Sequence, residues 1–342
     1  MASLRQVAQR AGVSVATASR VATGSADVRA DTRLRVEQAM QELLYVHPGQ
    51  RSATGLIGVH VPELVNPIFP AFAHALETSA AAADLACVIC NNTWQDKREQ
   101  AYAHQLLDLD ATGMVFVSTQ VTQRREDHEL FDRLFSRRFP VVLMNEILPS
   151  AHAGVVLTDE QLGTRLATEH LIQLGHQRIG LMAQSERLPP ASERIAGWRG
   201  ALEAAGLADY GTQVMADFSV DGGRVALRYF AGLGERRPTA VICGSDLMAM
   251  GVLQEAAELG LKVPGDLSVI GFDGVEAGSW ANPPLTTVEH PIDEMARTAI
   301  ETIRVLAAEP GRQLPTSVFR PSLRIRGTTA PPPSTRAPAA SE

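Results

Sequence analysis

The chain has 342 residues, of which 45% are hydrophobic and 20% charged, a composition that excludes wholesale disorder and leaves room for two or three domains. No apolar run approaches the roughly 18 residues of a membrane span, and the first residues, MASLRQVAQR, lack the apolar stretch of a signal peptide, so we expect a cytoplasmic protein with no membrane partner. The net charge of -7 is uneven: residues 1–55 hold seven arginines against four acidic residues, a balance of +3 that would attract phosphate, and the rest of the chain carries -10.

The N-terminal segment predicts a helix followed by a tight turn. Ser3 and Gln6 match the Ser-x-x-Gln capping box, in which each side chain satisfies a backbone N–H of the first turn. Apolar residues then recur at helical spacing along one face: Leu4, Val7, Ala8 and Ala11. Gly12 suits the turn that ends this helix, because glycine adopts a positive φ without strain.

A second helix is predicted over residues 15–23, with Ser14 as its N-cap. Ala18 and Val21 point towards the first helix, whereas the opposite face carries small apolar residues, hydroxyls and one arginine. Such a face suits the DNA major groove, where arginine pairs with guanine and small apolar groups touch thymine methyls. The candidate DNA-contacting residues here are Ser14, Val15, Ala16, Thr17, Ser19 and Arg20. Residues 31–44 predict a supporting third helix, and an ordinary helical hairpin is the alternative on spacing alone.

After a linker at residues 46–55 (VHPGQRSATG), short β-rich runs alternate with segments of helical spacing, such as residues 96–110 and 161–174. The β-rich runs are LIGVHV, ACVIC, GMVFV, VVLMN, VVLT, RIGLM, AVICG and LSVIGF. This alternation predicts parallel sheets with helices on both faces, and so many units predict two doubly wound α/β subdomains. Ligands of such sheets bind beyond the carboxyl ends of the strands, so the cleft between the subdomains is the expected site. Residues 330–342 are rich in Pro, Ala and Ser and are predicted to be disordered.

Three cysteines, Cys87, Cys90 and Cys243, are too few for a disulfide framework. Cys87-x-x-Cys90 matches half of a zinc motif, but no second pair completes a tetrahedral site, and the surrounding LACVIC is typical of a buried strand. We expect buried structural thiols and no metal.

The segment SLRQVAQRAGVSVATASRVATG closely resembles the DNA-binding head of the LacI/GalR family of repressors. The resemblance continues, in the family's order, through LIGVHVPELVNPIFPAFAHALE, DEQLGTRLATEHLIQLGHQRIGLM, ERIAGWRGAL and SDLMAMGVLQEAAELGLKVPGDLSVIGFD, which is followed by PPLTTVEHP.

This resemblance implies an all-α helix-turn-helix head (residues 1–45) joined to a periplasmic-binding-protein-like α/β body (residues 56–329). It implies a homodimer or higher oligomer on a palindromic double-stranded DNA operator, and a small effector, a sugar or related metabolite, between the subdomains. By analogy, one subdomain spans residues 56–158 and 285–317, and the other spans residues 159–284 and 318–329. Both release of DNA by the effector and corepression stay open.

The linker departs from the family pattern, in which a short hinge helix pushes a leucine between base pairs of the minor groove. Here only eleven residues separate Tyr45 from Ile57, and they include Pro48, which opposes helix formation. No leucine occurs in the linker before Leu56. We therefore expect the leucine wedge to be absent, the operator to be bent less, and Arg51 to enter the minor groove.

Matching the family blocks residue by residue gives a candidate effector site. Arg194 and Asp273 would clamp the polar groups of the ligand, and would pair with each other in the empty site. Phe218 would stack on the ligand, since sugars bind through aromatic faces as well as polar groups. The other candidate contact residues are Asn66, Phe69, Asn92, Trp94, Asn145 and Ser245.

Several nearby residues have simpler interpretations. Asp246 precedes an apolar helical run and is expected to be its N-cap. Trp198 is expected to pack against its neighbours, whereas ligand contact and packing are equally good interpretations of Trp280. Four histidines show neither metal-ligand nor catalytic-triad spacing and are expected at the surface or in helix packing: His74, His104, His170 and His176.

Two other classes of protein fit the sequence less well. A solute-binding protein of a sugar transport system would need a signal peptide and would have no DNA-binding head. An enzyme would need site chemistry, and the sequence contains no GxxxxGK(S/T), GxSxG or HExxH motif. We therefore predict a transcriptional regulator without catalytic residues, cofactor or metal.

Overall fold

A computed structural model describes residues 3–23, 25, 28–43, 45, 55–118, 129–148, 153–184 and 189–333. The helices are α1 (Leu4–Ala11), α2 (Val15–Ala22), α3 (Ala30–Glu42), α4 (Ile68–Ala82), α5 (Asp96–Asp108), α6 (Glu129–Ser136), α7 (Glu160–Gln173), α8 (Pro189–Ala204), α9 (Val220–Ala231), α10 (Asp246–Glu258) and α11 (Ile292–Ala308). The strands are β1 (Gly55–Val61), β2 (Leu85–Asn91), β3 (Gly113–Val117), β4 (Val141–Met144), β5 (Gly154–Thr158), β6 (Ile179–Ala183), β7 (Thr212–Met215), β8 (Ala240–Cys243), β9 (Ser268–Asp273), β10 (Thr286–Glu289), β11 (Ser317–Phe319) and β12 (Ser322–Arg324). Within these described ranges, no helix is long and apolar enough to cross a membrane.

The head consists of α1, α2 and α3 around a small apolar core. Both hydrogen bonds of the capping box between Ser3 and Gln6 are present, and Gly12 ends α1 with φ of 65°. The Ser14 side chain caps α2 by accepting a hydrogen bond from the Thr17 backbone N–H. The buried core residues are Val7, Ala8, Ala11, Ala18, Val21, Val36 and Ala39. The predicted helical head is therefore confirmed, with α3 beginning one residue earlier than expected.

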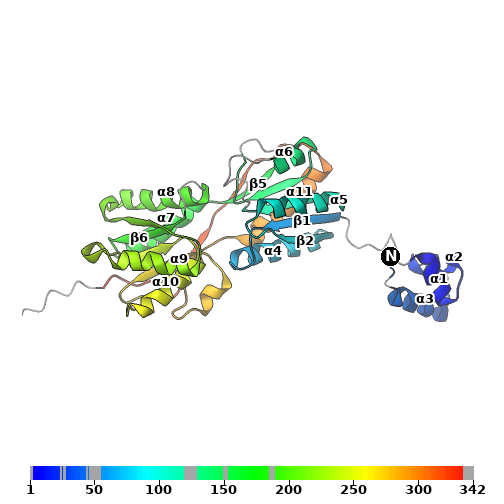
Figure 1. The fold of residues 1–342 in the computed structure, drawn as a ribbon, viewed down its shortest axis with the longest axis horizontal. Helices are drawn as coiled ribbons and strands as arrows, with labels where there is room; N and C mark the ends of the chain where they lie inside the picture. The colour runs from blue at the N-terminus through cyan, green and yellow to red at the C-terminus, as the bar shows by residue number, and fades with distance from the viewer. Residues whose placement is uncertain are drawn as a thin grey trace, which may run out of the picture. The chain divides into compact units, whose positions relative to one another are not determined.

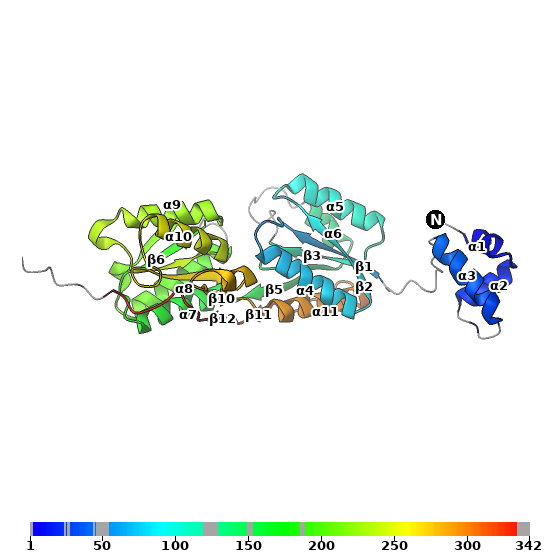
Figure 2. The same ribbon diagram turned by 90° about the horizontal axis from the view of Figure 1, so that it is seen from below.

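The body has two lobes, each built on a largely parallel six-stranded sheet (Figure 1). Lobe one contains the sheet β11-β5-β4-β3-β1-β2 with α4, α5, α6 and α11, and lobe two contains the sheet β12-β10-β9-β8-β6-β7 with α7, α8, α9 and α10. Figure 2 shows α4 and α11 on one face of the first sheet and α5 and α6 on the other. In lobe two, α7 and α8 pack together on one face, and α9 and α10 pack together on the other.

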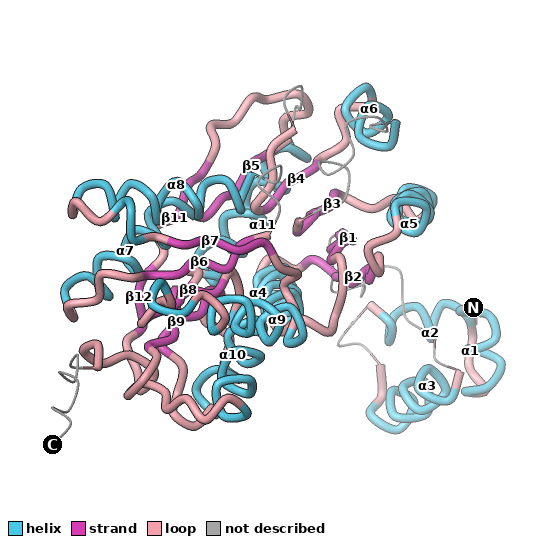
Figure 3. The backbone as a smooth tube through the Cα atoms, turned by 60° about the vertical axis from the view of Figure 1, so that its left-hand side comes forward, coloured by secondary structure: helices cyan, strands magenta, loops and turns pink. Residues whose placement is uncertain are grey.

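The central strands explain this architecture. β3, β4, β6, β8 and β9 are buried along their whole length and consist mainly of Val, Ile, Leu and Met. Continuous apolar runs suit parallel strands that helices cover on both faces, as the tube in Figure 3 shows. The two doubly wound subdomains predicted from strand-helix alternation are therefore confirmed.

The chain passes between the lobes three times. It leaves lobe one after β5, returns between β10 and α11, and crosses again between β11 and β12. β10 pairs with β9 in lobe two, although the sequence analysis placed its residues in lobe one. β11 pairs with β5 as far as Phe319, two residues beyond the expected end of lobe one. These strands are only four and three residues long, so their sequence did not show which sheet they join.

The C-terminal segment is anchored further along the chain than predicted. The backbone N–H of Ala330 donates to Ser268 Oγ at 3.1 Å, and its carbonyl accepts from the same hydroxyl and lies 2.9 Å from His176 Nε2. The predicted disordered tail is therefore wrong at residue 330, because this buried polar network holds it to lobe two. Residues 334–342 lie outside the described ranges.

Gly197 and Gly200 on α8 provide a matched test of the packing of α8 on α7. A Cβ at Gly197 would overlap the backbone carbonyl of Gln161, whereas a Cβ at Gly200 meets nothing within 4 Å. We expect Gly197→Ala to lower the free energy of unfolding by about 1–3 kcal/mol through overpacking. Gly200→Ala should raise it by roughly 0.5–1 kcal/mol, because alanine is the better helix former. Urea denaturation of both variants checks this, and effects of equal sign would contradict the packing argument.

Candidate functional site

A cavity lies between the two lobes of the body, with about 810 Å³ of empty space that is partly open to solvent. Its lining combines aromatic rings with converging polar groups, the usual character of a small-molecule site. The lining residues are Asn66, Ile68, Phe69, Phe72, Trp94, Ser118, Asn145, Glu146, Glu160, Gln184, Pro190, Ala191, Arg194, Phe218, Asp273 and His290.

Seven of the nine candidate ligand residues line this cavity: Asn66, Phe69, Trp94, Asn145, Arg194, Phe218 and Asp273. Asn92 does not, because its buried amide donates to Glu99 Oε2 on α5 at 2.8 Å. Ser245 does not either; it is 1% exposed and caps α10 by accepting from the Met248 N–H. We therefore withdraw Asn92 and Ser245 as direct contacts and keep the other seven.

Four lining residues at or shortly after strand ends have a positive φ. Trp94, Ser118 and Asn145 have φ of 54°, 52° and 54°, and Asp273 has φ of 128°. Non-glycine residues in this region store strain, which tends to accumulate at functional sites. All four lie at the carboxyl ends of β2, β3, β4 and β9, where open α/β sheets bind ligands.

Arg194 projects from α8 and is held on three sides. Its Nε donates to Glu160 Oε2 at 2.7 Å, and its Nη1 donates to the Gly244 carbonyl. The guanidinium lies 3.9 Å from the centre of the Phe272 ring and 5.5 Å from that of Phe218. The predicted pair of Arg194 with Asp273 is wrong for this structure, because Glu160 at the start of α7 provides the carboxylate.

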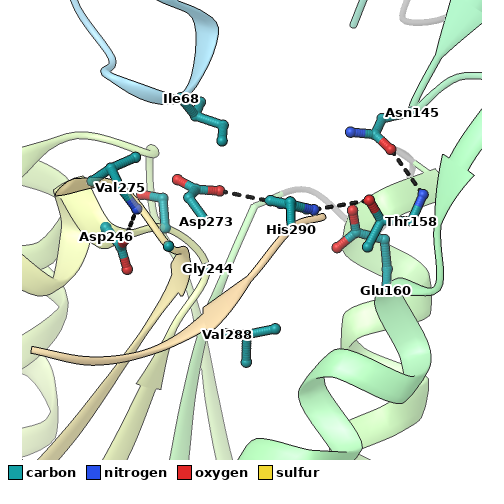
Figure 4. A network of polar contacts seen from close by, with 12 residues as sticks. Ile68, Asn145, Thr158, Glu160, Gly244, Asp246, Asp273, Val275, Val288 and His290 are labelled. Carbon is teal, nitrogen blue, oxygen red and sulfur yellow. Dashed lines mark hydrogen bonds and ion pairs between the residues drawn. The ribbon is translucent and has the colours of Figure 1, made fainter. Parts of the chain in front are cut away.

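Asp273 instead faces His290, whose Nε2 lies 3.7 Å from Asp273 Oδ1 (Figure 4). The other nitrogen of His290 lies 2.8 Å from Thr158 Oγ1, and the Thr158 N–H donates to Asn145 Oδ1 at 3.0 Å. Asp273 Oδ2 is buried and has no hydrogen-bond partner among the described residues. An unpaired buried carboxylate oxygen at a cavity wall suits a ligand hydroxyl as donor.

Asp246 does not cap α10, contrary to prediction, because Ser245 is the N-cap. The Asp246 carboxylate is fully buried and accepts from Thr287 Oγ1 at 2.5 Å and from the Val275 N–H at 2.8 Å. Burial, and then the neighbouring Asp273 carboxylate, raise the pKa of Asp246 well above its ordinary value. Asp273 at the end of β9 therefore opposes ionisation of Asp246 at the start of α10.

Sequence reasoning missed several polar residues of this site. Ser118, Glu146 and Gln184 line the cavity without having been predicted, and three others form its polar contacts: Thr158, Glu160 and His290. Each of these three lies where the chain leaves one lobe for the other or directly beside that point. Glu160 and His290 fall within the quoted blocks DEQLG and TTVEHP, but the family match gave them no ligand role. The available signal was a polar residue next to a strand end, which the crossing points bring into the cavity.

The two tryptophans, His176 and the cysteines differ in how deeply they are buried. Trp198 is 4% exposed and belongs to the apolar core of lobe two, as predicted. Trp280 is 76% exposed and does not line the cavity described above. His176 is buried and hydrogen-bonded to Thr239 and Ser268. Cys90 and Cys243 are buried and Cys87 is half-buried, and burial raises the pKa of the Cys90 thiol to about 11.

The expected DNA-reading face of α2 is open to solvent in the head. Val15, Ala16 and Arg20 are exposed, whereas Ala18 and Val21 are buried against the other helices. Ser14 Oγ lies 2.8 Å from Thr17 Oγ1, and Thr17 and Ser19 are half-buried. Arg51 and residues 46–54 of the linker lie outside the described residues.

His60 makes lobe one sensitive to acid. It is 1% exposed and stacks on Phe116 with ring centroids 4.4 Å apart. Burial lowers its pKa from 6.5 to about 4. Between these pH values the unfolded chain therefore binds a proton that the folded chain does not. The contribution of His60 to the free energy of unfolding is fully present above pH 6.5. It is lost as pH falls towards 4, by roughly 3 kcal/mol in total. In denaturation curves across this range, His60→Leu should flatten the pH dependence and the exposed His74→Leu should not.

Comparisons with known proteins agree with this architecture. Residues 3–48 match the model of bacterial regulatory proteins of the lacI family, and residues 168–329 match the periplasmic binding protein-like domain. An uncharacterized HTH-type transcriptional regulator in the aml 5'region of Streptomyces limosus is 39% identical, over 96% of this chain and 94% of that protein. The HTH-type transcriptional regulator GalR of Escherichia coli is 34% identical over 97% of both chains.

Solved structures support the same relationship. The lac repressor dimer bound to operator and the anti-inducer ONPF is 27% identical, covers 96% of this chain and 99% of its own, and has a TM-score of 0.75. The complex of the transcriptional regulator CelR with cellobiose is also 27% identical, with 96% and 100% coverage and a TM-score of 0.69. Since relatives above 30% identity span nearly the whole of both chains, this chain belongs to the lacI family of bacterial HTH-type transcriptional regulators.

Proposed function

We propose that this protein is a repressor that binds a palindromic double-stranded operator as a homodimer and responds to a sugar or sugar derivative held between its lobes. The observation that carries the proposal is the interlobe cavity, which brings aromatic rings and polar side chains from both lobes together. Phe69, Trp94 and Phe218 offer faces for a sugar ring, and Asn66, Asn145 and Asp273 offer groups for its hydroxyls.

The comparisons support the dimer, the operator and the sugar effector. One similar structure is a dimer on its operator, another holds cellobiose, and a 31% identical relative in Escherichia coli is a ribose operon repressor. In mechanistic terms, the effector would shift an equilibrium between lobe arrangements by its difference in affinity for them, and so change operator affinity.

A thermal-shift screen tests the effector. D-ribose, D-galactose, maltose and cellobiose are compared with sugar acids, polyols and nucleobases. A ligand at one hundred times its Kd adds about 2.7 kcal/mol to the free energy of unfolding, so a sugar should raise the Tm. A panel in which only the nucleobases stabilise the protein would overturn the sugar assignment. A gel shift with the best sugar then shows whether it releases the operator or strengthens binding.

Arg20 tests the DNA-binding face. Arg20→Ala should weaken binding to a palindrome selected from random DNA by roughly 1–3 kcal/mol, because one bidentate contact to guanine is lost. Binding to a scrambled duplex should change much less. Arg10→Ala is the control, since Arg10 lies on α1 and pairs with Glu42 of α3 at 2.7 Å. Equal losses on both duplexes would show that Arg20 contacts only phosphate.

In the linker, the expected loss of the leucine wedge and the minor-groove role of Arg51 are also part of this proposal. A circular-permutation gel assay should show little bending at the operator centre, and a strong central kink would contradict it.

A further inference from the structure

Two of the three segments that cross between the lobes are tied together by one buried histidine. Thr158 ends β5, directly before the first crossing, and His290 lies in the second crossing, between β10 and α11. Both side chains are almost fully buried. The 2.8 Å contact between His290 Nδ1 and Thr158 Oγ1 therefore joins the two crossings directly.

The same imidazole reaches the cavity wall. His290 Nε2 lies 3.7 Å from Asp273 Oδ1, and the ring meets Phe272 edge-on, with centroids 5.4 Å apart. A carboxylate beside Nε2 favours the tautomer with its proton on that nitrogen, which leaves Nδ1 to accept from the Thr158 hydroxyl. Asn145, Thr158, His290 and Asp273 then form one continuous chain of polar contacts from lobe one to lobe two (Figure 4).

We propose that His290 is a positioning residue that restrains the arrangement of the two lobes and holds Asp273 in place for the effector. A single rigid ring contacts both crossings and the carboxylate, so the lobes cannot rotate about the crossings without breaking one of these contacts. A ligand hydroxyl that donates to Asp273 would change the contact between Asp273 and His290. Effector binding would thereby alter the restraint on the arrangement of the lobes. The effector part rests on the proposed function; the restraint itself does not.

The restraint is measured without any ligand, as the distribution of distances between two spin labels in the full chain. Labels are placed at Asp108→Cys on α5 and Glu203→Cys on α8, two exposed positions on different lobes, in a Cys87→Ser background. The variants are His290→Leu, which removes both contacts, and Thr158→Val, which removes the hydroxyl at nearly constant volume. His170→Leu is the control, because His170 bonds Thr329 within lobe two.

The expected result is a distribution at least twice as wide in His290→Leu and Thr158→Val, with the double variant no wider than either single variant. His290→Gln, which retains hydrogen-bonding groups, should recover part of the narrow distribution. Widths equal to those of the unsubstituted chain and of His170→Leu would overturn the proposal. If no sugar stabilised the protein in the thermal-shift screen, these widths would still decide the role of His290.

Discussion

Replacing Arg194 with methionine is expected to lower the free energy of unfolding by about 3–5 kcal/mol, because it leaves the Glu160 carboxylate buried without its cation. The side chains of Arg194 and Glu160 are 8% and 5% exposed, so the little water that reaches the carboxylate compensates poorly for the lost cation. The Gly244 carbonyl also loses a donor. Chemical denaturation at neutral pH measures the effect.

A second variant separates this stability effect from ligand binding. Arg194→Met combined with Glu160→Leu replaces the buried ion pair with apolar groups, a change that is often neutral or stabilising. The double variant should therefore regain most of the lost stability but not the sugar binding, since the guanidinium donors are absent. The exposed pair of Arg304 with Glu301 is the control, and Arg304→Met should cost less than about 1 kcal/mol. Recovery of binding in the double variant would remove Arg194 from the ligand site.

Replacing Asp273 with asparagine is expected to have opposite effects on binding and on stability. Sugar affinity should fall roughly ten- to hundredfold, because a hydrogen bond to a charged group contributes about 1.5–3 kcal/mol. Stability at pH 7 should rise, because the substitution removes the like charge that helps to raise the pKa of Asp246. Asparagine also tolerates positive φ at least as well as aspartate.

The sign of the pH dependence identifies the cause. Asp246 has a pKa that is higher in the folded chain than in the unfolded chain, so its contribution to stability is present below about pH 3.8 and is lost as pH rises through the folded-state pKa. Asp273→Asn should reduce that loss, and its gain in stability should vanish near pH 3.8. A uniform gain at all pH values would point to relief of backbone strain instead. The exposed Asp209→Asn should change neither binding nor stability.

Local patterns predicted the elements that depend on local physics. The capping box at Ser3, the turn at Gly12 and the apolar face of α1 follow from spacing and backbone freedom, and all are present. The buried central strands were equally predictable, because continuous apolar runs suit strands that helices cover on both faces. The prediction of a buried strand at LACVIC is wrong, because β2 lies at the edge of its sheet with Val88 and Ile89 39% and 44% exposed. The short strands β7, β10, β11 and β12 were not predicted, since their pairing depends on neighbours distant in sequence.

In the candidate site, the sequence located residues correctly but not their partners. Family position placed Arg194 and Asp273 at the cavity, yet the sequence paired them with each other. The fold instead gives Arg194 to Glu160 and Asp273 to His290. Arg194 and Glu160 are 34 residues apart and meet because α8 packs on α7 within lobe two.

The sequence and the tertiary structure determined different features of this protein. By itself the sequence determined a helix-turn-helix head, a body of two doubly wound lobes and the residue types of a polar, aromatic cavity, because helix caps, periodicity and apolar runs act over a few residues. Only the tertiary structure decided which carboxylate meets which cation, which strands complete each sheet, and that His290 joins the two crossings beside Asp273. Those choices depend on burial and on contacts between distant segments, which exist only once the chain has folded.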